Sequence, residues 1–276
     1  MKLERTKNSV KGIVSGMINK IILLIIPFIV RTIFIKTLGM EYLGLNSLFS
    51  SILNILNLAE LGVGSAIVFS LYSAIAKNDE KEICALMNFY KKIYRIIGIL
   101  VVAIGLIILP FIRQLCKGSV PTDVNIYILY LMYLVNSASS YFLYAYKNCL
   151  LTAYQQTYIS NNVSTFVKVG LNVLQAIFLL LGQGYYVYLA LAILATITEN
   201  IVNAIWATRK YPNYKANGEI PKDEKKMIYK KVKALFFYKV GGVVLSSVDS
   251  IVISSFLGLT VLGKYNNYYY VITVLF

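Results

Sequence analysis

The sequence predicts an all-α, polytopic membrane protein with about seven complete transmembrane helices and part of an eighth. Of its 276 residues 58% are hydrophobic and only 14% are charged, whereas soluble domains are about 45–50% apolar and about 25% charged. The apolar residues form long blocks, and about 20 such residues cross a hydrocarbon core as a helix. Because lipid offers no hydrogen bonds to the backbone, these blocks should be helices.

The predicted spans follow one another along the whole chain. They cover residues 13–37, 43–75, 94–112, 124–146, 157–181, 185–207 and 234–258, and an eighth begins near residue 265. The second block would be roughly 50 Å long as one helix. It must therefore tilt, protrude or break, and Gly62 and Gly64 in its middle would permit a bend or close packing. Since the sequence stops within the eighth block, we expect it to belong to a longer protein.

The distribution of lysine and arginine predicts the orientation of the helices. With the N-terminus inside, most of the 27 basic residues lie in inner segments, and those in outer segments are Lys36, Arg113, Lys117 and Lys264. Short loops rich in Lys and Arg remain cytoplasmic. The N-terminus is therefore expected in the cytoplasm, and the net charge of +15 is explained by the anionic inner leaflet, with no need for a nucleic-acid partner.

A long basic segment divides the chain. We expect residues 1–208 to form a first transmembrane lobe of six helices, residues 209–233 a cytoplasmic basic linker, and residues 234–276 the truncated start of a second lobe. The stretch KDEKKMIYKKVK at the end of the linker is compatible with a helix lying on the membrane surface or with a solvated linker.

Charged residues within the spans are the candidate functional residues, because each costs roughly 2.5–3.5 kcal/mol to insert unless it faces a cavity or a partner. Arg31 and Lys168 would suit an anionic ligand such as phosphate or pyrophosphate. Structural pairing of each with a buried acid is equally compatible with the sequence. Lys20 lies near the inner end of its span and is expected to extend to the interface.

Three acids within spans have two alternative roles. Glu60, Glu199 and Asp249 would either couple transport to an ion gradient through a proton or pair structurally with a cation. Structural pairing is favoured for Glu60, because small residues around it indicate tight helix packing. Tyrosines near span ends, such as Tyr141, are expected to form an interfacial belt.

Several classes of chemistry are excluded or disfavoured. The sequence has no histidine, so histidine-based catalysis, proton relay and metal binding are excluded. Its three cysteines, Cys84, Cys116 and Cys149, show neither a disulfide framework nor metal-ligand spacing. We therefore predict no metal and no cofactor.

Two runs resemble a known family. YLGLNSLFSSILNILNLAELGVGSAIVFSLY (42–72) contains Glu60, and VDSIVISSFLGLTVLGKYNNYYYV (248–271) contains Asp249, Gly258 and Gly263. Both are similar to the oligosaccharide flippases of the multidrug/oligosaccharidyl-lipid/polysaccharide transporter superfamily. The resemblance implies a non-enzymatic protein of the bacterial plasma membrane, with two lobes of six helices around a central cavity that opens to each side in turn.

The same resemblance implies a substrate and partners. The substrate would be an undecaprenyl-pyrophosphate-linked oligosaccharide repeat unit, and Arg31 and Lys168 are positioned to bind its pyrophosphate. The partners would be the lipid bilayer, this substrate and the polysaccharide polymerase machinery.

Three alternatives remain open. A multidrug cation exporter of the same superfamily would have acids, rather than cations, dominating its cavity. A membrane glycosyltransferase or polymerase would need long extramembrane loops with catalytic carboxylates, but the outer loops are short and residues 182–184 include no charge. A purely structural fragment is the third alternative.

Overall fold

The computed structural model describes residues 5–60, 62–118 and 120–275, and within these ranges the regular structure is entirely helical. The helices and 3₁₀ turns are α1 (Arg5–Thr37), α2 (Met40–Leu56), η1 (Asn57–Glu60), α3 (Val63–Lys77), α4 (Glu80–Ile108), η2 (Leu109–Phe111), α5 (Ile112–Leu115), α6 (Ile126–Phe142), η3 (Ala145–Lys147), α7 (Asn148–Ala153), α8 (Thr157–Leu180), α9 (Tyr185–Lys210), α10 (Lys222–Leu257) and α11 (Leu259–Leu275).

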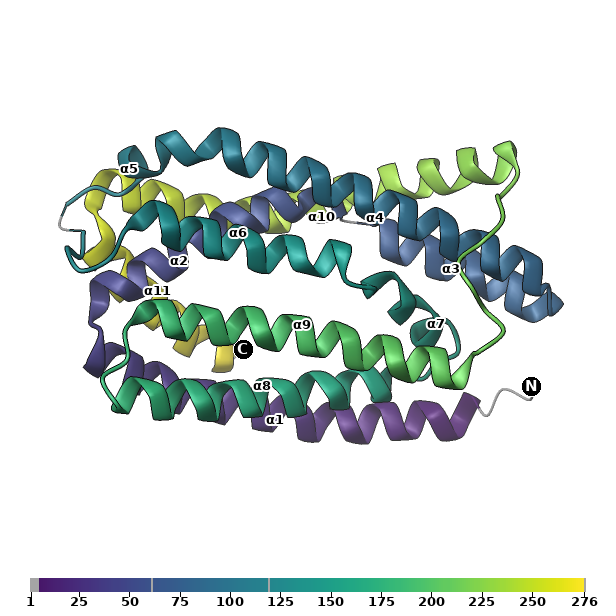
Figure 1. Ribbon diagram of the computed structural model, residues 1–276, viewed down its shortest axis with the longest axis horizontal. Coiled ribbons are helices and arrows are strands. Elements are labelled where there is room, and N and C mark those ends of the chain that lie inside the picture. Colours follow the sequence, from purple (N-terminus) through teal and green to yellow (C-terminus); the bar gives the residue numbers. More distant parts are fainter. Residues whose placement is uncertain (1–4, 61, 119, 276) are drawn as a thin grey trace.

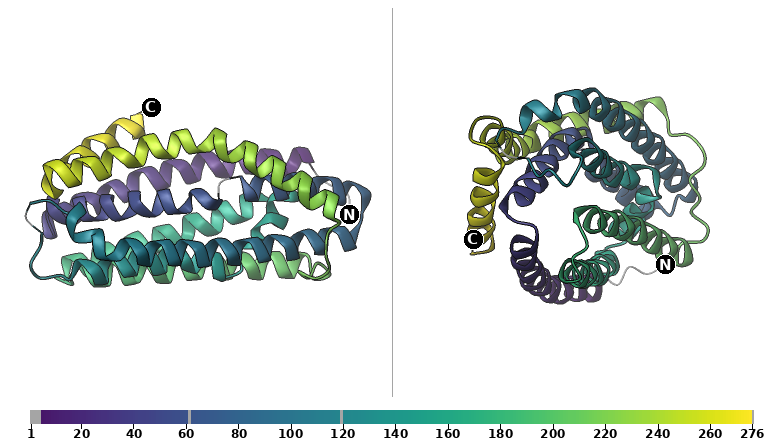
Figure 2. Two further views of the ribbon diagram at one scale, coloured as in Figure 1. Left: turned by 90° about the horizontal axis from the view of Figure 1, so that it is seen from above. Right: turned by 60° about the vertical axis from the view of Figure 1, so that its left-hand side comes forward.

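The long helices lie side by side in an elongated bundle (Figure 1). Helix α1 packs on α8, α8 on α9, α9 on α6 and α6 on α4, while α2 packs on α10 and α11. Seen toward the end of the bundle, the helices lie along a curve rather than in a flat layer (Figure 2). Helices distant in sequence therefore become neighbours. Helix α2 packs mainly on the last two helices, α10 and α11, and also contacts α1.

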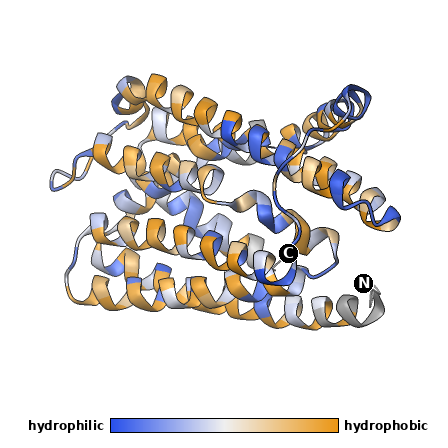
Figure 3. Cartoon of the chain, turned by 45° about the vertical axis from the view of Figure 1, so that its right-hand side comes forward, coloured by the Kyte–Doolittle hydropathy of each residue, from blue (hydrophilic) through white to orange (hydrophobic). Residues whose placement is uncertain are grey.

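Among the described residues, five helical segments are long and apolar enough to cross a membrane. A sixth is obtained if α6 and the segment Ala145–Ala153, which are bent by 46° at the break between them, form one span. Large apolar side chains such as Phe166 (78% exposed) lie on the outside of the bundle, and apolar residues dominate the helices in Figure 3. A surface rich in exposed apolar side chains fits a lipid environment. The protein is therefore a multi-pass membrane protein.

The second apolar block is broken. Helix α2 ends at Leu56, the 3₁₀ turn η1 follows, and α3 starts at Val63. Gly62 stands before α3 with φ 90°, a backbone conformation that favours glycine. A Cβ on Gly62 would also lie 2.7 Å from Cβ of Leu235 on α10. The expected bend and close packing are therefore both found at this glycine.

Helices α4 and α10 begin well before their predicted spans. Helix α4 starts at Glu80, where the Asp79 side chain accepts a hydrogen bond from the Glu82 backbone N–H at 2.9 Å. This N-cap gives a partner to a backbone N–H of the first turn and so stabilises a helix start at Glu80. The basic residues between Glu80 and the predicted span are therefore helical as well. Helix α10 starts at Lys222 and continues without a break into the apolar span, so the end of the predicted linker is helical.

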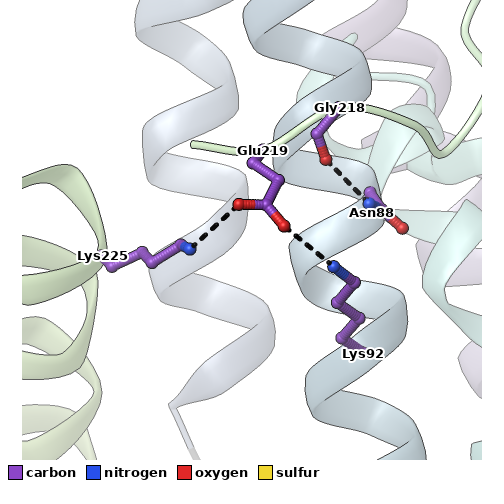
Figure 4. Close-up of polar contacts among 5 residues, drawn as sticks. All are labelled: Asn88, Lys92, Gly218, Glu219 and Lys225. Carbon is purple, nitrogen blue, oxygen red and sulfur yellow. Dashed lines mark hydrogen bonds and ion pairs between the residues drawn. The ribbon is translucent and has the colours of Figure 1, made fainter. Parts of the chain in front are cut away.

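The connection between α9 and α10 is fixed to α4. Asn88 Nδ2 donates a hydrogen bond to the Gly218 carbonyl oxygen at 2.8 Å. The Glu219 carboxylate lies 3.6 Å from Lys92 Nζ and 4.0 Å from Lys225 Nζ (Figure 4). These ion pairs are largely exposed, so each stabilises the fold by about 0–1 kcal/mol.

A candidate substrate cavity and the buried charges

A cavity of about 580 Å³ lies between α3, α4, α7 and α9. Its walls combine aromatic rings, amides and one acid, from Gly64, Ser65, Val68, Phe69, Tyr72, Tyr90, Tyr94, Tyr144, Ala145, Asn148, Cys149, Thr152, Glu199, Asn200 and Asn203. Glu199 is the charged residue among these lining residues, which include no Lys or Arg. The bends at η1 and η3 bring α3 and α7 against α4 and α9, so the two breaks in the helices shape this cavity.

Three acceptor groups at the cavity have no hydrogen-bond partner among the described residues. The amide oxygens Oδ1 of Asn148 and Asn203 are buried, and the side chain of Asn203 is only 7% exposed. Neither oxygen accepts a hydrogen bond within the described part of the chain. Glu199 is half-buried, and we find neither a hydrogen bond nor an ion pair to its carboxylate among the described residues. Glu199 and Asn203 are four residues apart and therefore share one face of α9.

Two lysines lie over aromatic rings at this cavity. Lys231 Nζ is 3.9 Å from the centre of the Phe69 ring. Lys147 Nζ is 5.3 Å from the centre of the Tyr144 ring and donates a hydrogen bond to Thr208 Oγ1 at 2.7 Å. Both cations are thus engaged with other groups and neither pairs with Glu199.

Glu60 lies behind the cavity wall and is held by tyrosines. Tyr94 donates a hydrogen bond to Oε1 of Glu60, and Tyr141 donates to Oε2 at 2.9 Å. Tyr90, which lines the cavity together with Tyr94, donates to the Tyr94 hydroxyl at 2.9 Å. The structure therefore surrounds this acid with neutral hydroxyls. Tyr141 is 4% exposed and lies inside the bundle, which corrects the expectation of an interfacial position.

Arg31 has neutral neighbours. Its Nε donates a hydrogen bond to Asn267 Oδ1 at 3.1 Å, and its guanidinium carbon lies 5.0 Å from the centre of the Tyr270 ring. Its Nη2 is buried and has no hydrogen-bond partner within the described ranges. Among the residues that the structure describes, no carboxylate forms an ion pair with Arg31. One end of the guanidinium fork is therefore buried with its hydrogen-bond donors unsatisfied.

Lys168 lies at a different depth from Arg31. Helices α1 and α8 run in parallel, since Ser15 donates a hydrogen bond to Asn162 and Gly12 lies beside Thr157. Counting from the Ser15–Asn162 contact at 1.5 Å per residue, the backbone of Arg31 lies about 15 Å farther along the bundle than that of Lys168. Lys168 is exposed, and the structure does not bring these two cations together.

The remaining charges in the spans lie on the surface of the bundle. Lys20 is exposed on α1, and Asp249 is exposed on α10, where it accepts a hydrogen bond from the Tyr265 hydroxyl at 3.2 Å. Neither residue lines the cavity. The three acids named from the sequence thus occupy three different environments: a tyrosine network for Glu60, an open cavity for Glu199 and the bundle surface for Asp249.

Sequence reasoning missed the amides of the cavity. Asn148 and Asn203 lie in apolar helices, and an uncharged polar residue in a span is a weak signal on its own. The spacing of Glu199 and Asn203 by one helical turn was the available signal. Asn148 could not have been found in this way, because it reaches the cavity from another helix.

An all-helical bundle with several helices long and apolar enough to span a membrane, a lipid-compatible surface and a polar cavity between its helices defines a polytopic membrane protein. Residues 9–275 match the family of polysaccharide biosynthesis proteins. The chain therefore belongs to this family of membrane transporters, which confirms the resemblance to the repeat-unit flippases of the multidrug/oligosaccharidyl-lipid/polysaccharide superfamily. Comparison with curated proteins and with solved structures gives no significant match.

Proposed function

We propose that the protein flips undecaprenyl-pyrophosphate-linked oligosaccharide repeat units across the bacterial plasma membrane, without enzymatic chemistry and with its N-terminus in the cytoplasm. In this proposal residues 1–208 form the first lobe, residues 209–233 the basic linker, and residues 234–276 the start of a second lobe, giving seven complete spans and part of an eighth. Membership of the polysaccharide biosynthesis family supports this assignment.

The single observation that supports this function best is the free end of the Arg31 guanidinium. A cation within a membrane span is costly unless it has a partner, and the hydrogen bonds of Arg31 leave its buried Nη2 unsatisfied. A guanidinium binds phosphate oxygens through charge-assisted hydrogen bonds. A pyrophosphate would therefore supply both the missing acceptor and the missing counter-charge, while Lys168 would contact the substrate at another depth.

The proposed mechanism is alternating access. The two lobes rock against each other, the pyrophosphate stays near Arg31, and the lipid tail remains in the bilayer. Ion coupling would require an acid that can exchange a proton or a cation with water. Glu199, which lines the cavity, is the first candidate for this exchange and Asp249 on the bundle surface is a second, whereas the tyrosine hydrogen bonds of Glu60 support a structural role.

The test is flipping in proteoliposomes of a fluorescent undecaprenyl-pyrophosphate oligosaccharide. Replacing Arg31 by Gln should lower the flipping rate at low substrate concentration about 10- to 100-fold, since a charge-assisted hydrogen bond is worth about 1.5–3 kcal/mol. Lys20→Gln, which removes an exposed cation from the same helix, is the matched control and should leave the rate unchanged. Equal rates for the Arg31 variant and the wild type would contradict this role for Arg31.

A multidrug cation exporter is the second candidate function, and the observation that favours it is Glu199, the charged residue among those that line the cavity. Export of an organic cation from the same vesicles, without flipping of the lipid-linked oligosaccharide, would replace the flippase proposal.

A further inference from the structure

We propose that the cavity between α3, α4, α7 and α9 is a subsite for a sugar that carries a protonated amine. In this subsite Glu199 binds the ammonium group, and the amide oxygens of Asn148 and Asn203 accept its remaining N–H groups or neighbouring hydroxyls. The inference rests on the proposed function, because the sugar would reach the cavity as part of a lipid-linked repeat unit.

The unpartnered acceptors indicate which ligand fits. A buried acceptor without a hydrogen bond costs about 1–3 kcal/mol, and the Oδ1 atoms of Asn148 and Asn203 are two such acceptors at one cavity. The Glu199 carboxylate adds a negative charge to the same wall. An ammonium group has three N–H donors and no acceptor. It therefore complements this set of groups in both charge and donor number.

The size and the aromatic walls favour a sugar over a bare cation. The cavity volume of about 580 Å³ falls in the range of small-molecule sites, about 300–1,000 Å³, whereas an ion needs little more room than one water molecule. Phe69, Tyr72 and Tyr144 place aromatic rings around the cavity. Such rings offer flat apolar faces to the C–H faces of a sugar ring, and for Phe69 and Tyr144 this would be the face opposite the lysine that lies over each ring. The amides would accept hydrogen bonds from the sugar hydroxyls.

The charge of the cavity disfavours acidic sugars. A uronic acid here would bring its carboxylate toward Glu199, and like charges at short distance repel. The two nearby lysines keep their positive charge, but neither is among the residues that line the cavity: Lys231 lies over the Phe69 ring, and Lys147 lies over the Tyr144 ring and donates to Thr208. The charge of the lining residues therefore favours a sugar with a positive or neutral substituent, and the pyrophosphate would bind elsewhere, as proposed for Arg31.

The experiment compares two disaccharides by calorimetry on the protein in nanodiscs. The disaccharide of glucosamine carries amines, and cellobiose has the same skeleton with hydroxyls in their place. The titration is made at about pH 5.5, roughly two units below the value of about 7.7–8.0 for a peptide α-amino group, so that the amines stay protonated although the neighbouring sugar oxygens make them less basic. We expect the amino disaccharide to bind at least about 10-fold more tightly than cellobiose, a difference of about 1.4 kcal/mol.

Two variants test the named residues. Glu199→Gln should lower the affinity for the amino disaccharide about 10-fold, to the level of cellobiose, whereas Glu80→Gln, at an exposed acid on α4, should not change it. Asn203→Ala should weaken both sugars, and this result stands even if the Glu199 variant does not fold. Equal affinity for the two sugars, or no effect of Glu199→Gln, would overturn the inference.

Further outcomes separate the inference from the function on which it rests. Binding of tetraphenylphosphonium that depends on Glu199, with no binding of the amino disaccharide, would overturn the sugar subsite in favour of an organic-cation site. If lipid-linked oligosaccharides are flipped but amine-bearing ones have no advantage, the subsite alone is wrong. If no lipid-linked oligosaccharide is flipped, the proposed function is wrong as well.

Discussion

The two tyrosines that donate hydrogen bonds to Glu60 should couple to it with unequal free energies. Tyr141 donates to Glu60 at 2.9 Å, and its hydroxyl also lies 2.9 Å from Oδ1 of Asn57. Tyr94 donates to Glu60 and itself accepts from Tyr90. Without the carboxylate, Tyr141 therefore keeps an acceptor in Asn57, whereas Tyr90 and Tyr94 can donate only to each other, so one of these two buried hydroxyls loses its acceptor.

The perturbation is a pair of double-mutant cycles, which combine Glu60→Met with Tyr94→Phe and with Tyr141→Phe. A hydrogen bond to a charged group contributes about 1.5–3 kcal/mol in water-soluble proteins, and interhelical bonds in membranes average about 0.6 with a maximum of about 1.7 kcal/mol. We expect a coupling free energy of about 1.5 kcal/mol for Glu60 with Tyr94. For Tyr141 we expect at most about half of that value, because Asn57 replaces the lost acceptor.

The assay is reversible denaturant unfolding of the purified protein in detergent, which gives the free energy of unfolding of each variant. Tyr130→Phe is the matched control, since its hydroxyl donates to the Gly105 carbonyl oxygen at 3.1 Å, and its coupling to Glu60 should be close to zero. Equal couplings for Tyr94 and Tyr141, or none for Tyr94, would refute the assignment of these hydrogen bonds.

Three further predictions follow from burial and close packing. Asn203→Leu should raise the free energy of unfolding by about 1–3 kcal/mol, because it removes a buried unpaired oxygen; a loss of stability in denaturant titration would contradict this. Gly263→Ala should destabilise the protein by about 1–3 kcal/mol, since its Cβ would overlap the Met40 carbonyl oxygen on α2, whereas Gly170→Ala, with open space around its Cβ, should be neutral or slightly stabilising. Burial raises the pKa of the Cys116 thiol to about 11, so its thiolate is scarce at pH 8; maleimide labelling followed by mass spectrometry should therefore be slow until the protein is denatured, and rapid labelling of the native protein would refute this.

The sequence alone located most of the helices. The observed bounds of α1, α8 and α9 agree with the predicted spans at their apolar ends within a few residues. The main difference is at the charged ends, where α4 starts at Glu80 and α10 at Lys222. Hydropathy marks the part of a helix that lipid can solvate, and it gives no information about helical turns that continue into water.

The candidate site was predictable only in part. Arg31, Glu60 and Glu199 were found from the sequence because a charge in an apolar span is rare and costly. Their environments were not predictable. Two charges with the same local sequence signal, Arg31 and Lys168, differ in that the first is partly buried with an unpartnered nitrogen and the second is exposed.

The sequence by itself therefore determined the fold class, the family and the positions of the membrane-embedded charges, because hydropathy and backbone hydrogen bonding in lipid act within a single helix. The tertiary structure decided which groups meet. Arg31 reaches Asn267 on the last helix, and Glu60 reaches Tyr94 and Tyr141 on two others. Such contacts depend on how whole helices are placed and rotated against one another, which no local pattern in the sequence specifies.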